Sequence, residues 1–305
     1  LTDLGTFSVE AGRGLCPTIV HGTLHAGLVI DALGTDEQRA ALLPALASGK
    51  SRATTALGSA RDAGVVTPPL RAEARGASWV LNGQVDFVLD AERADYVVVS
   101  GRDVATGLNL VCVVATQAAS LRLDPLTIMG GQAAACLHFD GVTIEDDLMV
   151  LGADGGVTDS QLHRLANTAT ALLSLDLVGV GEAALQRTVD YTTMRHQFGR
   201  PIASFQAAQH LVANMHIALS AARLAARAAV IQLEEGQTAT RATAVARMHA
   251  ATAAKLATLD AHQLHGGMGY VVDTDLHKYS ERARVLSTLG GGADVAATWL
   301  EGASS

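Results

Sequence analysis

The sequence has few cysteines, and the three that it has lie far apart. Cys16, Cys112 and Cys136 form no C-x-x-C pair. A disulfide framework or a cysteine-rich zinc site needs more cysteines at closer spacing. The pattern is typical of reduced, buried thiols in a cytosolic protein.

The sequence also lacks an excess of positive charge and any uninterrupted apolar run. It carries 22 Lys and Arg against 30 Asp and Glu, a net charge of -8. This balance gives no support for nucleic-acid binding, which needs a basic face. The longest apolar runs are interrupted by Gly, Ser, Asp or Thr, so we expect no membrane span and a cytoplasmic location. Because residue 1 is Leu rather than Met, we expect further sequence to precede it.

Length and periodicity predict three segments. A chain of 305 residues that is 49% hydrophobic can form one to three domains. We predict an N-terminal helical segment at residues 1–52, a β domain at 53–155 and a helical bundle at 156–305. In the first segment, Glu10 to Val29 reads as one helix. Thr35 and Gln38 form a capping box for the next helix, which Gly49 closes.

The middle segment reads as short strands. Trp79–Leu81 and Asp86–Leu89 flank Asn82-Gly83, the dipeptide most typical of a hairpin turn. Further strands are expected at 96–100, 108–115 and 134–139, which favours a compact barrel or sandwich. The sequence GADGG at 152–156 reads as the exit loop.

The last segment predicts a four-helix bundle. Long Ala- and Leu-rich stretches at 163–193, 205–234 and 239–262 have apolar residues at three- and four-residue spacing. A shorter helix is expected to begin near Thr274 or Asp275, either of which can cap it. Four such helices form a bundle.

His21 and His25 stand four residues apart, the spacing of a helical metal pair. A third ligand is not evident in the sequence. We therefore predict no metal site and read both as polar residues of a helix.

The most informative stretch is Tyr191 to Gln206, YTTMRHQFGRPIASFQ, between two of the predicted long helices. Gly199 and Pro201 break the helix there. Arg195, Gln197 and Phe198 therefore lie at a sharp corner. An arginine, an amide and an aromatic can bind a phosphate and stack on a base. The alternative is a corner that only connects two helices.

Three motifs in the right order resemble the acyl-CoA dehydrogenase family. R-x-Q-F-G-R-P-I at Arg195–Ile202 is similar to a family signature. QLHGGMGY at Gln263–Tyr270 is similar to the family's Q-x-x-G-G-x-G-[YF]. LGTDEQRAALLPALASGK at Leu33–Lys50 resembles the turn and helix that close the family's N-terminal domain. The resemblance covers nearly the whole chain and implies a shortened helical N-terminal segment, a β-barrel-like middle domain and a C-terminal four-helix bundle.

The resemblance also implies an FAD site shared between subunits. In the family, the arginine and aromatic of R-x-Q-F-G and the backbone of Q-x-x-G-G hold the pyrophosphate and adenine of a neighbour's FAD. The matching candidates here are Arg195, Gln197, Phe198, Gln263, Gly266 and Gly267. The alternative is that Gly266-Gly267 only ends a helix.

The family's catalytic residues are missing. Its glutamate base, which removes the α-proton of the thioester, falls on Gly290 here. A second known position of the base matches Ala169. Neither glycine nor alanine can take a proton, and Asp294 is the nearest carboxylate along the chain. We therefore predict no catalytic residue in this chain.

The flavin-ring contacts of the middle domain are also changed. The family's T-E-P-x-A-G-S-D motif reads TALGSARD at Thr55–Asp62, without its Glu, Pro and Ser. The family's W-I-T reads Phe87-Val88-Leu89, and a leucine cannot bond the flavin edge.

This asymmetry predicts the non-catalytic subunit of an FAD-dependent acyl-CoA dehydrogenase. The resemblance implies a glutamate-bearing homologous partner, an α2β2 heterotetramer and an acyl-CoA substrate, with a steroid side chain as one example. One alternative is a flavin-dependent monooxygenase or oxidase on the same fold. Another is a structural subunit without flavin.

Overall fold

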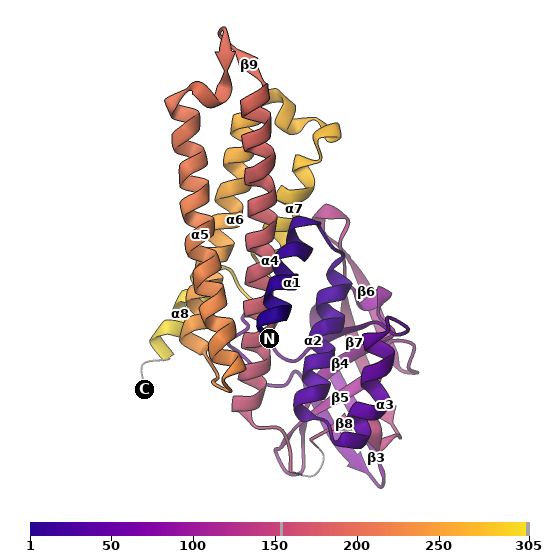
Figure 1. The fold of residues 1–305 in the computed structure, drawn as a ribbon. Coiled ribbons are helices and arrows are strands. Elements are labelled where there is room, and N and C mark those ends of the chain that lie inside the picture. The colour runs from indigo at the N-terminus through magenta and orange to yellow at the C-terminus, as the bar shows by residue number, and fades with distance from the viewer. Residues whose placement is uncertain (153–154, 303–305) are drawn as a thin grey trace. The chain divides into compact units, whose positions relative to one another are not determined.

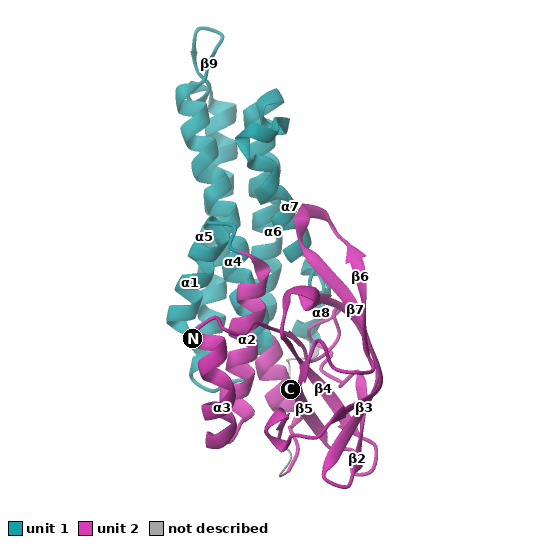
Figure 2. Ribbon diagram, turned by 90° about the vertical axis from the view of Figure 1, so that its right-hand side faces the viewer, with its two compact units in different colours: residues 1–16, 167–305 teal, residues 17–166 magenta. Residues whose placement is uncertain are grey.

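The fold consists of two compact units, seen in a computed structural model that describes residues 1–152 and 155–302. Unit 2 is Pro17–Ala166, and unit 1 combines Leu1–Cys16 with Asn167–Ser305. Figure 1 follows the chain from end to end and Figure 2 colours the two units. The predicted boundaries at 52/53 and 155/156 differ from this division, because the first helix joins unit 1 and the start of a long later helix joins unit 2.

The N-terminal segment contains two separate helices where one was predicted at Glu10–Val29. Helix α1 is Thr2–Arg13 and helix α2 is Thr18–Leu33. The prediction of a single helix was wrong because Pro17 has no N–H to donate to the helical ladder. Helix α1 ends at Arg13, with Gly14 as its C-cap, and Pro17 is the N-cap of α2.

Helix α3, Asp36–Ala47, begins as predicted. Gln38 N donates to Thr35 Oγ1 at 3.2 Å, and Thr35 N donates to Gln38 Oε1 at 2.9 Å, so the capping box is confirmed. The Gln38 amide nitrogen also donates to the carbonyl oxygens of Asp147 and Val150. The cap therefore also ties α3 to the end of the sheet.

Unit 2 is built on one mixed eight-stranded sheet. Its order is β6-β7-β3-β2-β4-β5-β8, with β1 pairing parallel to β4. The strands are β1 Ala53–Ala56, β2 Leu70–Arg75, β3 Ser78–Leu89, β4 Tyr96–Asp103, β5 Asn109–Ala115, β6 Leu121–Thr127, β7 Ala133–Ile144 and β8 Val150–Leu151. The predicted β domain is therefore confirmed, with β6 and β8 as the two ends of the strand order.

The hairpin predicted at Asn82-Gly83 was wrong. Strand β3 runs through both residues, and the reversal lies at Gly76-Ala77, between β2 and β3. Gly83 has φ +134° and pairs with Leu70 on one side and Phe139 on the other. The pairing with β7 shifts register between Leu81 and Asn82, so Asn-Gly marks a bulge in a strand.

Both faces of the central strands are buried, which explains their continuous apolar runs. In β4, Val97 and Val99 join one apolar cluster, while Val98 joins the cluster that contains Val29 and Ile30 of α2. Cys112 of β5 is fully buried, and burial raises the pKa of its thiol to about 12. Cys16, Cys112 and Cys136 are all free.

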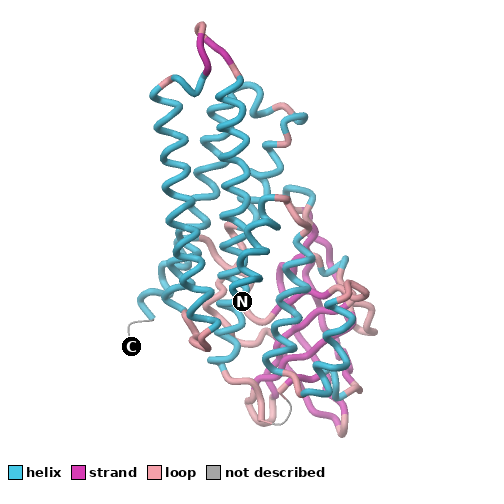
Figure 3. The backbone as a smooth tube through the Cα atoms, viewed as in Figure 1, coloured by secondary structure: helices cyan, strands magenta, loops and turns pink. Residues whose placement is uncertain are grey.

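Unit 1 is the predicted helical bundle with two additional helices. Figure 3 colours helices cyan and strands magenta along the chain. They are α1, α4 Asp159–Met194 from residue 167 onward, α5 Gln206–Glu234, α6 Thr240–His265, α7 Leu276–Leu286 and α8 Ala293–Gly302. Asp275 occupies the N-cap position of α7, but its side chain pairs with Lys278 and does not cap the helix. Of the predicted exit loop at 152–156, residues 153–154 lie outside the described part of the chain.

Helix α4 contributes buried residues, Leu177, Val178, Val180 and Ala184, to the apolar core of the bundle. It is the one described helix long and apolar enough to cross a membrane, but 72% of that apolar window is buried inside the protein. A Cβ on Gly12 would lie 2.1 Å from the Asp176 carbonyl oxygen, and a Cβ on Gly179 would lie 2.0 Å from the Val9 carbonyl oxygen. Only glycine permits α1 and α4 to approach this closely.

A buried ion pair joins α4 to α7. Arg282 donates to both carboxylate oxygens of Asp176, at 3.2 and 2.7 Å, and to the carbonyl oxygen of Cys16 at 2.7 Å. The Asp176 side chain is fully buried. This carboxylate is therefore fixed by the packing and is not free to act as a base.

Candidate dinucleotide site at the end of the bundle

The corner between α4 and α5 is a small β-hairpin. Strands β9 His196–Gln197 and β10 Arg200–Pro201 pair antiparallel beyond the ends of the two helices (Figure 1). Ile202 N donates to the Arg195 carbonyl oxygen at 2.9 Å and closes the hairpin at its base. Arg195 is thus held at a defined place by its backbone.

The turn of this hairpin exposes an aromatic side chain at some conformational cost. Phe198 has φ +53° and Gly199 has φ +80°, the positive values that a two-residue hairpin turn requires. An aromatic residue rarely adopts this conformation. Phe198 is 92% exposed, and its ring meets only the edge of Phe205 at 6.2 Å. Backbone strain of this kind is often found at ligand-binding positions, so Phe198 is a candidate contact for a ligand.

Arg195 and Gln197 lie on the surface of the hairpin. Both are exposed. Within the described residues, neither side chain forms a hydrogen bond or an ion pair with the protein. The neighbouring Arg200 differs, because its guanidinium carbon lies 4.0 Å from the centre of the Phe205 ring. Arg195 is therefore the arginine of this hairpin that is open to an anion.

The second motif lies where α6 ends. Gly266 has φ +57° and ψ -134°, a conformation that residues other than glycine rarely adopt. It is the C-cap of α6, so this glycine does end the helix. A Cβ on Gly266 or Gly267 would meet no atom within 4 Å. The backbone there borders open space that a ligand can approach. Gln263, one turn earlier, is exposed.

Aromatic stacking brings the two motifs to the same end of the bundle. The Tyr191 ring, one turn before Arg195, stacks on the His265 ring with centroids 4.3 Å apart. The Tyr191 hydroxyl also donates to the His265 carbonyl oxygen at 3.4 Å. Burial, with the charges of His262 and Arg187, lowers the pKa of His265, so the stacked ring is neutral at pH 7.

These features fit the pyrophosphate of a dinucleotide. Arg195 supplies a cationic fork, and the open backbone at Gly266-Gly267 permits close approach of a phosphate. Phe198 supplies an exposed apolar face. All six predicted binding residues lie on the hairpin or at the end of α6, and their role as ligands of FAD stays a prediction.

A buried arginine fixes the loop around Gly290, where the resemblance places the family's base. Arg247 of α6 is fully buried and donates from Nη2 to the carbonyl oxygens of Leu286, Leu289 and Gly291, at 2.8, 2.5 and 3.2 Å. Burial lowers the pKa of Arg247 to about 10. Arg247 was not predicted from the sequence, although an arginine inside an alanine-rich helix is a visible signal.

This loop contains no carboxylate in the described structure. Gly290 has φ +62°, Gly291 has φ +90°, and Asp294 is exposed at the start of α8. Ala169, the other possible position of a base, is a half-buried residue of α4. Neither position offers a group that takes a proton.

The residues that replace the flavin-ring motifs in unit 2 take part in its packing. Ala56, Leu57 and Val88 are 8%, 6% and 3% exposed. Thr54 Oγ1 donates to the Leu89 carbonyl oxygen at 2.8 Å, within the same region. Phe87 has φ +55° and lies in a bulge of β3. These positions therefore support the sheet.

His25 engages the threonine that begins the first of those motifs. Its Nε2 donates to the Leu165 carbonyl oxygen at 3.0 Å, so Nδ1 accepts from the Thr55 hydroxyl at 2.7 Å. Burial lowers the pKa of His25 to about 4. Both ring nitrogens are thus occupied. Across the described residues, no group of three His, Cys, Asp or Glu is placed to hold a metal ion.

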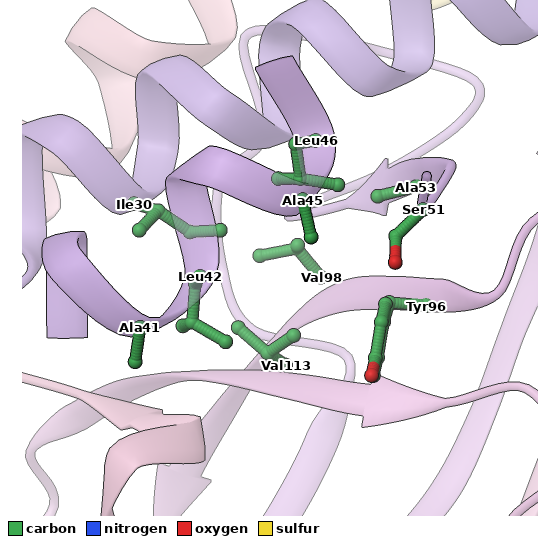
Figure 4. Close-up of a pocket in the computed structure, with 10 residues that line it drawn as sticks. All are labelled: Ile30, Ala41, Leu42, Ala45, Leu46, Ser51, Ala53, Tyr96, Val98 and Val113. Carbon is green, nitrogen blue, oxygen red and sulfur yellow. The ribbon is translucent and has the colours of Figure 1, made fainter. Parts of the chain in front are cut away.

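A small cavity in unit 2 is unrelated to the site. It has a volume of about 60 Å³ and lies between α3 and the sheet. Figure 4 shows its apolar walls, which include Ile30, Leu42, Val98 and Val113. Ligand sites for cofactors are several times larger, so this cavity is a packing gap.

Comparison with known proteins gives a consistent result. Residues 150–300 match the family model "Acyl-CoA dehydrogenase, C-terminal domain". The probable acyl-CoA dehydrogenase FadE25 of Mycobacterium tuberculosis is 30% identical over 294 residues, which cover 93% of this chain and 74% of that protein.

Two solved structures share the fold over nearly the whole chain. One is a variant of the Tcur3481-Tcur3483 steroid ACAD, at 31% identity and a TM-score of 0.87, covering 99% of this chain and 81% of that one. The other is the ChsE4-ChsE5 complex from Mycobacterium tuberculosis, at 25% identity and a TM-score of 0.84, covering 98% of this chain and 78% of that one.

Proposed function

Because this chain belongs to the acyl-CoA dehydrogenase family, we propose that it is the subunit of a heteromeric FAD-dependent acyl-CoA dehydrogenase that lacks its own catalytic base. The partner is a homologous subunit that carries the glutamate, in an α2β2 assembly. The substrate is an acyl-CoA thioester. A steroid side chain is our proposal for its acyl group, supported by the 31% identity to the Tcur3481-Tcur3483 steroid ACAD.

One observation carries the proposal. The loop at Gly290 holds no carboxylate, whereas Arg195 and the backbone of Gly266-Gly267 are open to a ligand. A chain that served its own flavin and substrate would need a carboxylate near Gly290 as well as the phosphate-binding groups at the end of the bundle. A chain that serves a neighbour's flavin needs only the phosphate-binding groups.

Each group at the end of the bundle has a separate part in this role. Arg195 binds the pyrophosphate of an FAD whose ring lies in the partner, and Phe198 packs on the cofactor. The backbone at Gly266 and Gly267 approaches the phosphates, and Gln197 and Gln263 offer amides. FAD itself supplies the acceptor for the electrons removed from the acyl chain.

The test compares the chain alone with the chain co-expressed with a glutamate-bearing acyl-CoA dehydrogenase subunit. We expect no acyl-CoA dehydrogenation by the chain alone, and both bound flavin and turnover in the complex. The measurements are the flavin absorbance per heteromer and the rate of acyl-CoA oxidation.

Two outcomes would replace the proposal. Flavin bound by the chain alone, with oxygen consumption, would indicate a monooxygenase or oxidase. A complex that forms without any flavin would indicate a structural subunit.

A further inference from the structure

Two arginines of unit 1 are buried, and they differ in what balances their charge. Arg282 pairs with the carboxylate of Asp176. Arg247 is fully buried, and among the described residues its hydrogen bonds all go to backbone carbonyl oxygens. Burial lowers the pKa of Arg247, and no described acidic side chain raises it. The charge of Arg247 is therefore buried without a counter-ion from the described part of the chain, which is energetically costly.

One nitrogen of Arg247 also lacks a hydrogen-bond acceptor. Its Nε and Nη2 donate to carbonyl oxygens of the loop at 286–291. Its Nη1 is buried and has no partner within the residues that the structure describes. A buried N–H in this position costs free energy, because folding removes it from water without a new hydrogen bond.

A second unpaired donor lies one helical turn before Arg247. Thr243 of α6 is fully buried, and its Oγ1 has no hydrogen-bond partner in the described structure. Residues four apart share one face of a helix, and a long side chain leans over the residue four positions earlier. The Arg247 guanidinium and the Thr243 hydroxyl are therefore neighbours, and neither donates to the other.

Other buried threonines of the bundle satisfy their hydroxyl groups within their own helix. Thr258 Oγ1 of α6 donates to the Ala254 carbonyl oxygen at 2.9 Å, and Thr188 Oγ1 of α4 donates to the Ala184 carbonyl oxygen at 2.7 Å. This bond to the residue four positions earlier is common for threonine in helices. The Thr243 hydroxyl makes no such bond and is available to a ligand.

Two buried donors beside one unbalanced positive charge define a ligand that fits them. It accepts hydrogen bonds, carries one negative charge and is small, because both residues are fully buried. We propose that Arg247 Nη1 and Thr243 Oγ1 bind a halide ion, which is chloride in ordinary solutions. A water molecule would satisfy the two donors but leave the charge of Arg247 unbalanced.

The ion acts on the loop around Gly290 through Arg247. The guanidinium that it fixes also donates to the carbonyl oxygens of Leu286, Leu289 and Gly291. The halide therefore stabilises the folded chain and this loop in particular. The proposal does not rest on the shared flavin, because it concerns residues of α6 and this loop alone.

The first test is thermal unfolding of the full chain at constant ionic strength, with chloride replaced stepwise by gluconate. Above the dissociation constant, each tenfold increase in chloride should raise the Tm by about 2 °C. Gluconate is too large for a buried site, and constant ionic strength keeps general screening equal. An equal Tm in chloride and in gluconate would overturn the proposal.

The matched variants are two threonines of α6. Thr243→Val keeps the size of the side chain and removes the hydroxyl, so the chloride concentration needed for a given rise in Tm should increase by about tenfold. Thr258→Val is the control, because the Thr258 hydroxyl is already bonded within the helix, and it should keep the wild-type chloride dependence. The same dependence in Thr243→Val as in the wild type would contradict the assignment, whether or not an Arg247→Met chain folds.

The second test is anomalous diffraction from crystals of the full chain grown in sodium bromide. Bromide replaces chloride and scatters anomalously, so we expect a peak within hydrogen-bonding reach of Arg247 Nη1 and Thr243 Oγ1. Density without an anomalous signal at this place would mean an ordered water only and would overturn the proposal. Flavin content of the heteromer is a separate measurement, so failure of the halide site and failure of the proposed function are distinguishable.

Discussion

The end of the bundle in unit 1 and the Thr55–Leu89 region of unit 2 use their side chains in opposite ways. At the end of the bundle, Arg195 and Phe198 are exposed, and their side chains contribute little to the packing of the described residues. In unit 2, Leu57 and Val88 lie in the apolar core, and Thr55 is bonded to His25. Residues that the fold does not need have kept the family pattern, whereas residues that have lost it now serve the fold.

The comparison has a direct consequence for mutations. Changes to the exposed side chains at the end of the bundle, such as Arg195 and Phe198, should alter ligand binding and leave stability nearly unchanged. Changes towards the family pattern in unit 2 should lower stability and restore no function.

The largest effect is expected when the family's glutamate is restored in the first motif of unit 2. Ala56 is 8% exposed within an apolar cluster, so Ala56→Glu buries a carboxylate. The expected loss is about 3–5 kcal/mol of the free energy of unfolding. Urea denaturation measures it, with Arg61→Glu, at an exposed position of the following loop, as the control. An Ala56→Glu chain with the same free energy of unfolding as the wild type would show that these positions are not needed for packing.

His25 should make unit 2 sensitive to acid. Its pKa is about 4 in the folded chain and near 6.5 when unfolded, so only the unfolded state gains this proton as the pH falls from 6.5 towards 4. The free energy of unfolding should therefore fall by about 3 kcal/mol as the pH drops through that window, and His25 should cause no loss of stability above pH 6.5. His25→Gln should flatten this part of the stability profile. A profile equally steep in the variant would show that other groups cause the acid sensitivity.

Substitutions of Gly266 and Gly267 should distinguish backbone strain from contact with a ligand. Gly266→Ala forces a side chain into a conformation that glycine alone adopts and should cost about 1–3 kcal/mol. Gly267→Ala places its methyl in open space and should leave thermal unfolding unchanged while it lowers flavin content. If Gly267→Ala retains full flavin in the complex, no ligand approaches the backbone there.

Restoring the base alone should have no measurable effect on turnover. Gly290→Glu introduces a carboxylate where φ is +62°, and the flavin-ring positions of unit 2 remain occupied by packing residues. Acyl-CoA oxidation by the isolated variant should therefore stay at background. Turnover by this variant would show that the chain retains a working flavin site of its own.

The sequence predicted the order of elements because the period of apolar residues changes clearly between helices and strands. It placed the capping box at Thr35 and the β domain correctly. It failed at Asn82-Gly83, because the same dipeptide suits a turn and a bulge, and tertiary pairing with β2 and β7 decides between them. It failed at Pro17 because an apolar period continued across the break.

The candidate site shows a similar division. The motifs identified Arg195, Phe198 and Gly266, but the hairpin and the Tyr191–His265 stack depend on contacts between segments far apart in the chain. Arg247 escaped notice because its partners are backbone carbonyls, which carry no sequence signal.

The most direct test of the central claim is the flavin content of the heteromer with Arg195→Ala. A charge-assisted contact to a phosphate is worth about 1.5–3 kcal/mol, so retention of FAD should weaken roughly ten- to a hundredfold. Thermal unfolding should be unchanged, because Arg195 is exposed. Arg241→Ala is the control, since Arg241 is exposed at the start of α6, the other end of that helix from Gly266. Equal FAD affinity in wild type and Arg195→Ala complexes would contradict the shared-cofactor account.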